Sequence, residues 1–266
     1  MSPTLDTSRR LLCLGAALTA LQACDGHGGS GPQAAPSGDA NPAGVWQGSF
    51  TADDGTTRGF SVVMAPDGLF VGIIASNGVN GRFVIGTGDT TLDMFSATGT
   101  VFAQPGEGQL PNGQWSDALT VSSGNLVTHA SLRGSYSGGG ESGSFKLSYD
   151  DGLTSRGASL QAIAGIYDVY PPPLVNTATL VVNGDSITFA AGGGCNGAGT
   201  IAVIDSTMNI YSWSMQLGPC SGVDAATLSG LATLADNPRF GGTRNLIAVY
   251  GATADHERSF VFRGAK

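Results

Sequence analysis

Residues 44–66, GVWQGSFTADDGTTRGFSVVMAP, decide the fold class of this chain. Apolar and polar residues alternate on both sides of Asp54-Gly55, a dipeptide that favours a turn. This alternation predicts two β-strands, each with one face buried. Similar stretches, separated by Gly, Asp, Asn and Pro, recur to the end of the chain, and helical periodicity is almost absent after residue 43. The sequence therefore predicts an all-β protein.

The strand-like stretches fall into two consecutive series of about eight each. Both series open alike, because Ala43-Gly44-Val45-Trp46 matches Ala164-Gly165-Ile166-Tyr167. Three further matches follow in the same order: 93–96 with 209–212, 132–134 with 228–230, and 146–149 with 247–250. The repeated pattern indicates a tandem duplication. We predict one domain over residues 43–155 and a second over residues 160–266.

An antiparallel unit of about eight short strands must hide its two edge strands from other chains. Closing into an up-and-down barrel achieves this, so we predict two tandem small antiparallel barrels. Eight strands leave an interior that either is filled by side chains or holds one small ligand. A filled interior is expected in the first unit because aromatic residues recur along it: Trp46, Phe50, Phe60, Phe70, Phe83, Phe95, Phe102, Trp115 and Phe145.

The N-terminal segment has the pattern of an export signal. Arg9 and Arg10 precede thirteen uncharged, mostly apolar residues, 11–23. A helix of that length spans about 20 Å, which is short of the roughly 30 Å hydrocarbon core of a bilayer. A secretory signal is therefore favoured over a transmembrane anchor, and an ordinary buried helix is the alternative.

The end of this segment, Leu21-Gln22-Ala23-Cys24, resembles the bacterial lipobox. The resemblance implies that residues 1–23 are a lipoprotein signal peptide and that Cys24 carries diacylglycerol and an N-terminal acyl chain such as palmitate. Residues 24–42 are rich in Gly, Ala, Pro and Ser, which predicts a flexible tether. We therefore expect a protein of the bacterial cell envelope, lipid-anchored at the periplasmic face or at the outer-membrane surface.

The charge inventory argues against nucleic acid as a partner. The net charge is −8, and the chain has only two lysines, Lys146 and Lys266. A positive stripe that follows a phosphate backbone cannot be assembled from this inventory. Contact with a membrane would accordingly depend on the acyl chains, and the oligomeric state stays open.

Two cysteines, Cys195 and Cys220, remain in the predicted mature chain besides Cys24. A hairpin that turns at Asp205-Ser206-Thr207 would place Cys195 opposite residue 217, within a few residues of Cys220. In an oxidising compartment this proximity predicts a disulfide, which would stabilise the fold by about 3 kcal/mol. A redox-active pair is the alternative, but the spacing is unlike Cys-x-x-Cys.

No grouping of residues indicates catalysis, a metal or a cofactor. The chain has three histidines, of which His129 is expected on a strand and His256 in a turn, and three glutamates in loops or turns. Asp53-Asp54 and Asp150-Asp151 would lie at opposite rims of the first barrel, so both are interpreted as solvated turns. We therefore predict no enzymatic activity, no metal site and no cofactor.

The stretch YDVYPPPLVN, residues 167–176, is the candidate partner-binding segment. Its three prolines cannot donate hydrogen bonds to a sheet and favour an extended conformation. A stiff hairpin connection is the favoured interpretation, and the alternative is that the prolines form a protruding recognition loop together with the neighbouring tyrosines. The candidate contact residues are Tyr167, Tyr170, Pro171, Pro172 and Pro173.

The motifs GVWQGSF, PDGLF, GGCNGAGT, NIY and LSGLATL resemble those of a set of proteobacterial two-barrel lipoproteins with no established function. This resemblance covers nearly all of the predicted mature chain. More distantly, the Gly-rich barrels are similar in style to those of transferrin-binding-protein-like surface lipoproteins, and this likeness concerns the fold alone. We expect a lipid-anchored binding module without catalytic activity that uses barrel rims and loops to bind a protein or a small ligand. The alternative is a periplasmic immunity or inhibitor lipoprotein that neutralises a toxic enzyme.

Overall fold

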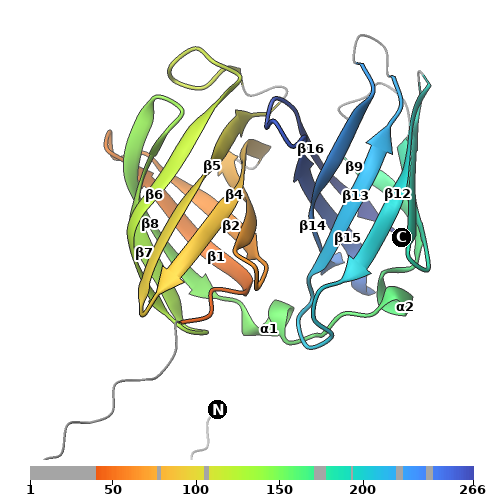
Figure 1. Cartoon of the computed structure of the whole chain (residues 1–266), viewed down its shortest axis with the longest axis horizontal. Helices are drawn as coiled ribbons and strands as arrows, with labels where there is room; N and C mark the ends of the chain where they lie inside the picture. Colours follow the sequence, from red (N-terminus) through yellow and green to blue (C-terminus); the bar gives the residue numbers. More distant parts are fainter. Residues whose placement is uncertain are drawn as a thin grey trace, which may run out of the picture. The chain divides into compact units, whose positions relative to one another are not determined.

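The computed structural model describes residues 40–76, 79–104, 108–170, 178–192, 194–219, 224–237 and 242–266. This part of the chain is all-β, with 67% of its residues in strands and 4% in helices. Its strands form two closed, antiparallel, eight-stranded barrels, so the predicted fold is confirmed (Figure 1).

In the first barrel each strand pairs with the next along the chain, and β8 pairs back with β1. Closure pairs every strand on both sides, which removes the exposed edges of an open sheet. The strands of the first barrel are β1 (Gly44–Ala52), β2 (Thr57–Met64), β3 (Leu69–Ser76), β4 (Val79–Thr91), β5 (Met94–Ala103), β6 (Ser116–Val127), β7 (Ser131–Gly138) and β8 (Glu141–Tyr149).

The second barrel has the same up-and-down order, and β16 pairs back with β9. Arg263, Gly264 and Ala265 lie opposite Tyr170, Val169 and Asp168 at this closing seam. The strands of the second barrel are β9 (Gly165–Tyr170), β10 (Ala178–Asn183), β11 (Ser186–Ala191), β12 (Cys195–Val203), β13 (Tyr211–Leu217), β14 (Ala226–Asn237), β15 (Gly242–Ala252) and β16 (Ser259–Ala265).

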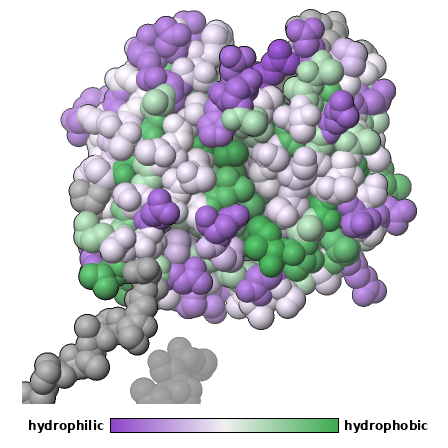
Figure 2. Space-filling view, in the orientation of Figure 1, coloured by the Kyte–Doolittle hydropathy of each residue, from purple (hydrophilic) through white to green (hydrophobic). Residues whose placement is uncertain are grey.

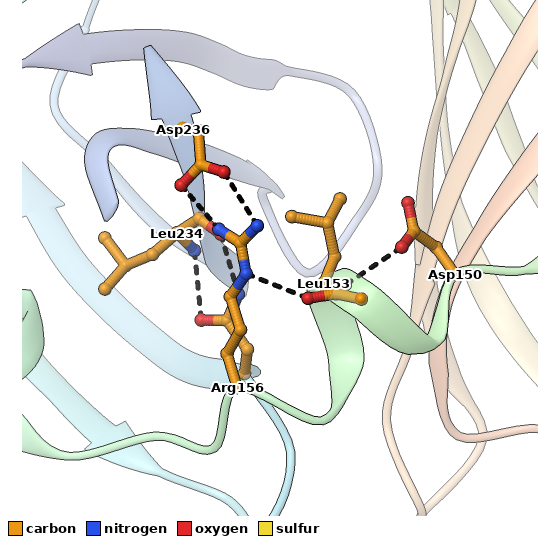
Figure 3. Close-up of polar contacts among 7 residues, drawn as sticks. Asp150, Leu153, Arg156, Leu234 and Asp236 are labelled. Carbon is orange, nitrogen blue, oxygen red and sulfur yellow. Dashed lines mark hydrogen bonds and ion pairs between the residues drawn. The ribbon is translucent and has the colours of Figure 1, made fainter. Parts of the chain in front are cut away.

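Two one-turn helices, α1 (Asp151–Thr154) and α2 (Leu160–Ile163), connect the barrels. The carboxylate of Asp150 caps α1 by accepting a hydrogen bond from the Leu153 N–H at 2.9 Å (Figure 3). The hydroxyl of Ser159 caps α2 in the same way. Such caps satisfy N–H groups that a helix leaves unpaired. The interpretation of Asp150-Asp151 as a solvated turn is therefore wrong, because this pair begins a helix.

The linker is bonded to both barrels. Arg156 donates to the two carboxylate oxygens of Asp236 on β14, at 2.7 and 2.8 Å (Figure 3). The buried Thr154 accepts from the N–H of Val45 on β1 through its Oγ1, and from the N–H of Asn209 through its backbone oxygen, both at 2.9 Å. One linker residue thus joins the first strand of the first barrel to the segment that precedes β13.

Side chains fill the interior of the first barrel. Six of its nine Trp and Phe residues lie inside it or pack against its core: Trp46, Phe50, Phe60, Phe70, Phe95 and Phe145. The space left among the apolar core side chains is about 40 Å³, little more than the liquid volume of one water molecule. The expectation of a filled interior is therefore confirmed for this barrel.

The other three Trp and Phe residues of this unit do not contribute to that interior. The rings of Phe83 and Phe102 are buried outside the barrel and stack with their centres 5.8 Å apart. Phe83 also stacks on Tyr250 of the second barrel, at 6.4 Å between ring centres. Trp115 is 58% exposed.

A third apolar cluster lies between the barrels, which pack against each other through it. It explains why the sequence of β2 to β4 contains apolar runs such as Val62-Val63-Met64-Ala65, which are buried on both faces of the strand. The buried members of the inter-barrel cluster are Val45, Val63, Ala65, Val71, Ile73, Phe83, Ile85, Phe102, Ile210, Leu231, Ala248, Tyr250 and Ala252.

The two barrels begin with equivalent anchors. The indole Nε1 of Trp46 donates to the backbone oxygen of Pro42 at 2.8 Å, and the hydroxyl of Tyr167 donates to that of Ile163 at 2.7 Å. Each acceptor precedes its aromatic residue by four positions. Because both rings are fully buried, these bonds satisfy the polar atoms that the rings carry into the core.

Only part of the internal sequence repeat falls on equivalent strands. Residues 93–96 and 209–212 lie around the start of the fifth strand of their barrels, β5 and β13. In contrast, 132–134 lies on the seventh strand of its barrel but 228–230 on the sixth. Likewise, 146–149 lies on the eighth strand of the first barrel but 247–250 on the seventh strand of the second. The repeated architecture is therefore clear, while the last two sequence matches do not align the barrels strand by strand.

Candidate functional site

Each barrel has a base, where its first strand begins and its last strand ends, and an opposite loop end. The linker joins the two bases, because it runs from the end of β8 to the start of β9. The connection between Ala103 and Ser116 lies at the loop end of the first barrel, and the turn between Ala252 and Ser259 lies at that of the second. These two connections bring side chains from both barrels to one place.

A pocket of about 260 Å³ lies between the barrels at their loop ends. Phe102, Gln104 and Trp115 of the first barrel and Glu257 and Phe260 of the second are among its lining residues. The walls are mainly aromatic, and a few polar groups lie among them, which is the usual composition of a ligand pocket. The volume is slightly below the range for drug-sized ligands, so the pocket suits a small molecule or one side chain of a partner.

One lining residue of this pocket, Gln104, has a buried amide nitrogen without a partner among the described residues. Its Nε2 is buried and forms no hydrogen bond with any described residue. An unpaired buried amide loses its hydration without compensation, which is unfavourable by about 1–3 kcal/mol. A carbonyl or carboxylate oxygen in the pocket would remove this penalty.

Aromatic contacts fix the wall that the second barrel contributes. The ring of Phe260 packs edge-on against Phe189 and Phe262, with ring centres 5.3 and 5.0 Å apart, and lies 6.1 Å from Trp213. The neighbouring turn is bonded to the first barrel, because Nδ1 of His256 lies 2.9 Å from Oγ1 of Thr100. The pocket is therefore preformed rather than assembled from independent loops.

Two strand ends that adjoin the prolines of the candidate partner-binding segment line this pocket. Val169 near the end of β9 and Ala178 at the start of β10 both line it. Pro171, Pro172 and Pro173 lie outside the described residues, as does the side chain of Tyr170.

Tyr167 cannot belong to an exposed loop, so its assignment as a contact residue is wrong. Its side chain is 0% exposed and lies in the core of the second barrel. The sequence placed it beside the prolines, but it is three residues earlier on β9 than the strand end and faces inward.

The register of β12 and β13 brings Cys195 toward the segment that contains Cys220. Cys195 is buried at the start of β12 and Cys220 lies outside the described residues. Gly197 lies opposite Leu217, and the Gly218 N–H donates to the Asn196 oxygen at 2.7 Å. In this register the residue opposite Cys195 is 219, whereas the sequence predicted 217. The hairpin centres on residue 207, one position later than expected. The disulfide stays a prediction, as do the signal peptide and the lipid on Cys24, which also lie outside the described residues.

The remaining candidate groups lie apart from one another. His129 is in the turn between β6 and β7 with a φ of 53°, not on a strand as expected, and its ring lies 4.7 Å from that of Tyr149. Asp53 lies at the loop end of the first barrel and Asp150 at its base, as predicted. The described ranges contain no group of three or more His, Cys, Asp or Glu side chains arranged to hold a metal ion.

Sequence reasoning missed two features of the loop end. Gln104 and Trp115 flank the pocket, but only the fold reveals that their connection meets the second barrel. Glu141, expected in a Gly-rich loop, is the first residue of β8 and pairs with two arginines inside the first barrel. The arginine on β2 was foreseeable, because Arg58 continues the inward-facing series of Phe60, Val62 and Met64.

Within the described ranges, neither helix has the length and apolar character needed to cross a bilayer. Comparisons of the chain with protein-family models, with curated proteins and with solved structures found no match. The resemblance to two-barrel lipoproteins and to transferrin-binding-protein-like barrels accordingly remains an expectation from the sequence.

Proposed function

We propose that this chain is a lipid-anchored binding module of the bacterial cell envelope that binds its ligand at the loop end and has no catalytic activity. The observation that carries the proposal is the pocket between the barrels. It combines an exposed Trp115, rigid aromatic walls and the buried, unpaired amide of Gln104. Such a combination suits recognition of a small molecule or of a side chain on a partner protein.

The position of the chain start supports a membrane on the opposite side. The N–H of Ala40, the first described residue, donates to the backbone oxygen of Leu92 at 2.8 Å, at the base of the first barrel. The preceding segment would therefore leave from the base. A tether over residues 24–42 has a reach of roughly 24 Å, so a lipid on Cys24 would hold the base near the membrane and direct the loop end away from it.

Exposed apolar residues at the same base agree with that orientation. Leu92, Met94 and Val127 are 63%, 48% and 50% exposed. They belong to neighbouring connections, because the Leu126 N–H donates to the Asp93 oxygen at 2.7 Å. Figure 2 shows apolar surface at the lower end of the first barrel. Apolar side chains of this kind would enter the headgroup region of a membrane, adding to the affinity that the acyl chains supply.

The proposal is tested by capture and fluorescence with the full chain carrying Cys24→Ser. Envelope extract is passed over this protein, over the same chain with Trp115→Ala, and over a control with Val127→Ala at the base. We expect a component that the first and third proteins retain and that the Trp115→Ala protein loses about tenfold or more.

The retained component is then added to the protein, and the quenching of the protein's tryptophan fluorescence by iodide is measured. Trp46 and Trp213 are buried, so the accessible signal comes from Trp115, and a bound ligand should protect it. Retention that does not depend on Trp115, or binding without protection of its fluorescence, would show that the pocket is not the binding site.

A further inference from the structure

Three charged side chains meet inside the first barrel, just below its loop end. Arg82 on β4 donates through Nη1 to Oε1 of Glu141 on β8. Nη1 of Arg58 on β2 lies 3.6 Å from the same oxygen, too far for a hydrogen bond. The side chains are only 23%, 14% and 14% exposed for Arg58, Arg82 and Glu141.

Among the described residues the direct contacts of this group are unbalanced, because two guanidinium ions share one oxygen of one carboxylate, although the exposed Asp54 also lies within electrostatic reach of Arg58. The Nη1 of Arg58 is buried and has no hydrogen-bond partner among the described residues. A buried cation without a full complement of acceptors is strongly unfavourable. The mouth of the barrel therefore contains a buried cationic donor that has no partner among the described residues.

A second donor in the same region is also unsatisfied. The hydroxyl of Tyr136 on β7 is buried and has no partner within the described part of the chain. Burial, followed by the negative charge of Glu141, raises the pKa of Tyr136 above its ordinary value, so this hydroxyl stays protonated and able to donate. Its sensitivity to the charges of Glu141, Arg82 and Arg58 places it within electrostatic reach of them.

The two arginines line a polar cavity. Its volume is about 110 Å³, roughly the liquid volume of three to four water molecules, and Gly81, Gly108 and Gln109 complete its polar walls. Nearby, the buried Leu110 of the β5–β6 connection packs into the barrel core and is held by a turn in which Gly113 N–H donates to its oxygen at 2.8 Å. The cavity is thus a bounded space lined by Arg58, whose buried Nη1 has no hydrogen-bond partner among the described residues.

We propose that Arg58 and Arg82 form a binding site for one small oxyanion, a carboxylate or phosphate group, in the mouth of the first barrel. The planar fork of a guanidinium matches two oxygens of such a group, and the bonds formed are charge-assisted. The bound group would bring a negative charge close to the second arginine. It would also accept a hydrogen bond from the unsatisfied Nη1 of Arg58. This site is separate from the pocket between the barrels and depends on neither the lipid anchor nor a protein partner.

The test measures thermal unfolding of the full chain carrying Cys24→Ser in sodium acetate and, separately, in sodium phosphate, each compared with sodium chloride at equal ionic strength. A ligand at ten times its Kd should raise the unfolding midpoint by about 3–6 °C. The added variants are Arg58→Met, which keeps an unbranched apolar side chain but removes the guanidinium, and Arg133→Met, which removes an exposed arginine from the outer face of β7.

The expected result is a saturable rise in the parent and in the Arg133→Met protein and its loss in the Arg58→Met protein. Arg58→Met should fold, because it removes an uncompensated charge. Saturation transfer from protein to the acetate methyl, observed by NMR, gives a readout that does not depend on stability. A response to acetate alone or to phosphate alone would assign the group that binds. No response to either anion, or an equal response in the Arg58→Met protein, would overturn the proposal.

Discussion

At the scale of single residues, Asn209 joins the segment before β13 to β14 and to the linker. It is fully buried, and its side chain bonds both backbone groups of Leu234, at 2.7 and 3.3 Å. Its own backbone donates to Thr154 and accepts from the hydroxyl of Thr233 at 2.7 Å. A buried amide is tolerated when all its groups are paired, and the loss of one member leaves the others unsatisfied.

Asn209→Ala should therefore lower the free energy of unfolding by about 2–4 kcal/mol, because it orphans both backbone groups of Leu234 and leaves a cavity. Urea unfolding followed by circular dichroism measures the change. Asn183→Ala, at an exposed position at the end of β10, is the matched control and should change stability by less than about 0.5 kcal/mol. A loss below about 1 kcal/mol for Asn209→Ala would contradict this role.

Two buried tyrosines predict how stability responds to alkali. Burial raises the pKa of Tyr167 and of Tyr136 above the ordinary value near 10. In the unfolded chain both hydroxyls ionise at lower pH than in the folded chain, so the folded state holds more protons above pH 10. The stabilisation is complete below pH 10 and is lost as the pH rises beyond it. The urea concentration at the unfolding midpoint should therefore fall as the pH is raised from 8 to 11. This decrease should be smaller in the Tyr167→Phe, Tyr136→Phe double variant. An equal decrease in the double variant would show that these tyrosines do not cause the loss of stability.

At the scale of elements, the distinctive feature is that β2 to β4 each contain a stretch that is apolar and buried on both faces. One face fills the first barrel, and the other packs against β14 and β15 of the second. The alternation that predicts strands also predicts one solvated face, so Val63, Ile73 and Phe83 would be expected either inside the barrel or in water. Their two-sided burial was in principle visible, because continuous apolar runs indicate strands buried on both faces.

A charge on this outer face should uncouple the barrels. Ile73 is buried in the inter-barrel cluster, so Ile73→Arg places an unpaired cation there. We expect one calorimetric unfolding transition for the parent and two for Ile73→Arg, one from each barrel. Ser61 lies opposite Ile73 on the neighbouring strand and is exposed, so Ser61→Arg is the control and should retain one transition. A single transition in Ile73→Arg would mean that the barrels do not depend on this face for cooperativity.

At the scale of the whole molecule, the number, order and closure of the strands followed from the sequence, whereas the sites did not. Strands and turns are local, so alternation and Gly, Asp and Pro signals locate them. A pocket between two barrels depends on which loops meet, and the positions of Gln104 and Trp115 along the chain carry no such information. Tyr167 illustrates the opposite error, because its proximity to three prolines suggested exposure while its place in the strand alternation dictated burial.

The proposed anchoring makes a prediction for the complete protein in its native host. Cells grown with labelled palmitate should incorporate the label into the chain, and Cys24→Ser should abolish incorporation while leaving the amount of protein within about twofold. Removal of the lipid should also release the protein from membranes into the soluble fraction. Label retained after Cys24→Ser, or absent from the parent, would refute acylation at this residue.

Phe102 belongs at once to the stacked rings between the barrels and to the lining of the pocket. The packing of the stacked rings therefore sets the position of Phe102 and, with it, the width of the pocket. Trimming Phe83 or Tyr250, neither of which lines the pocket, would change which molecules fit it. If the pocket binds a ligand as proposed, substitutions at such positions would alter its selectivity without changing any residue that contacts the ligand.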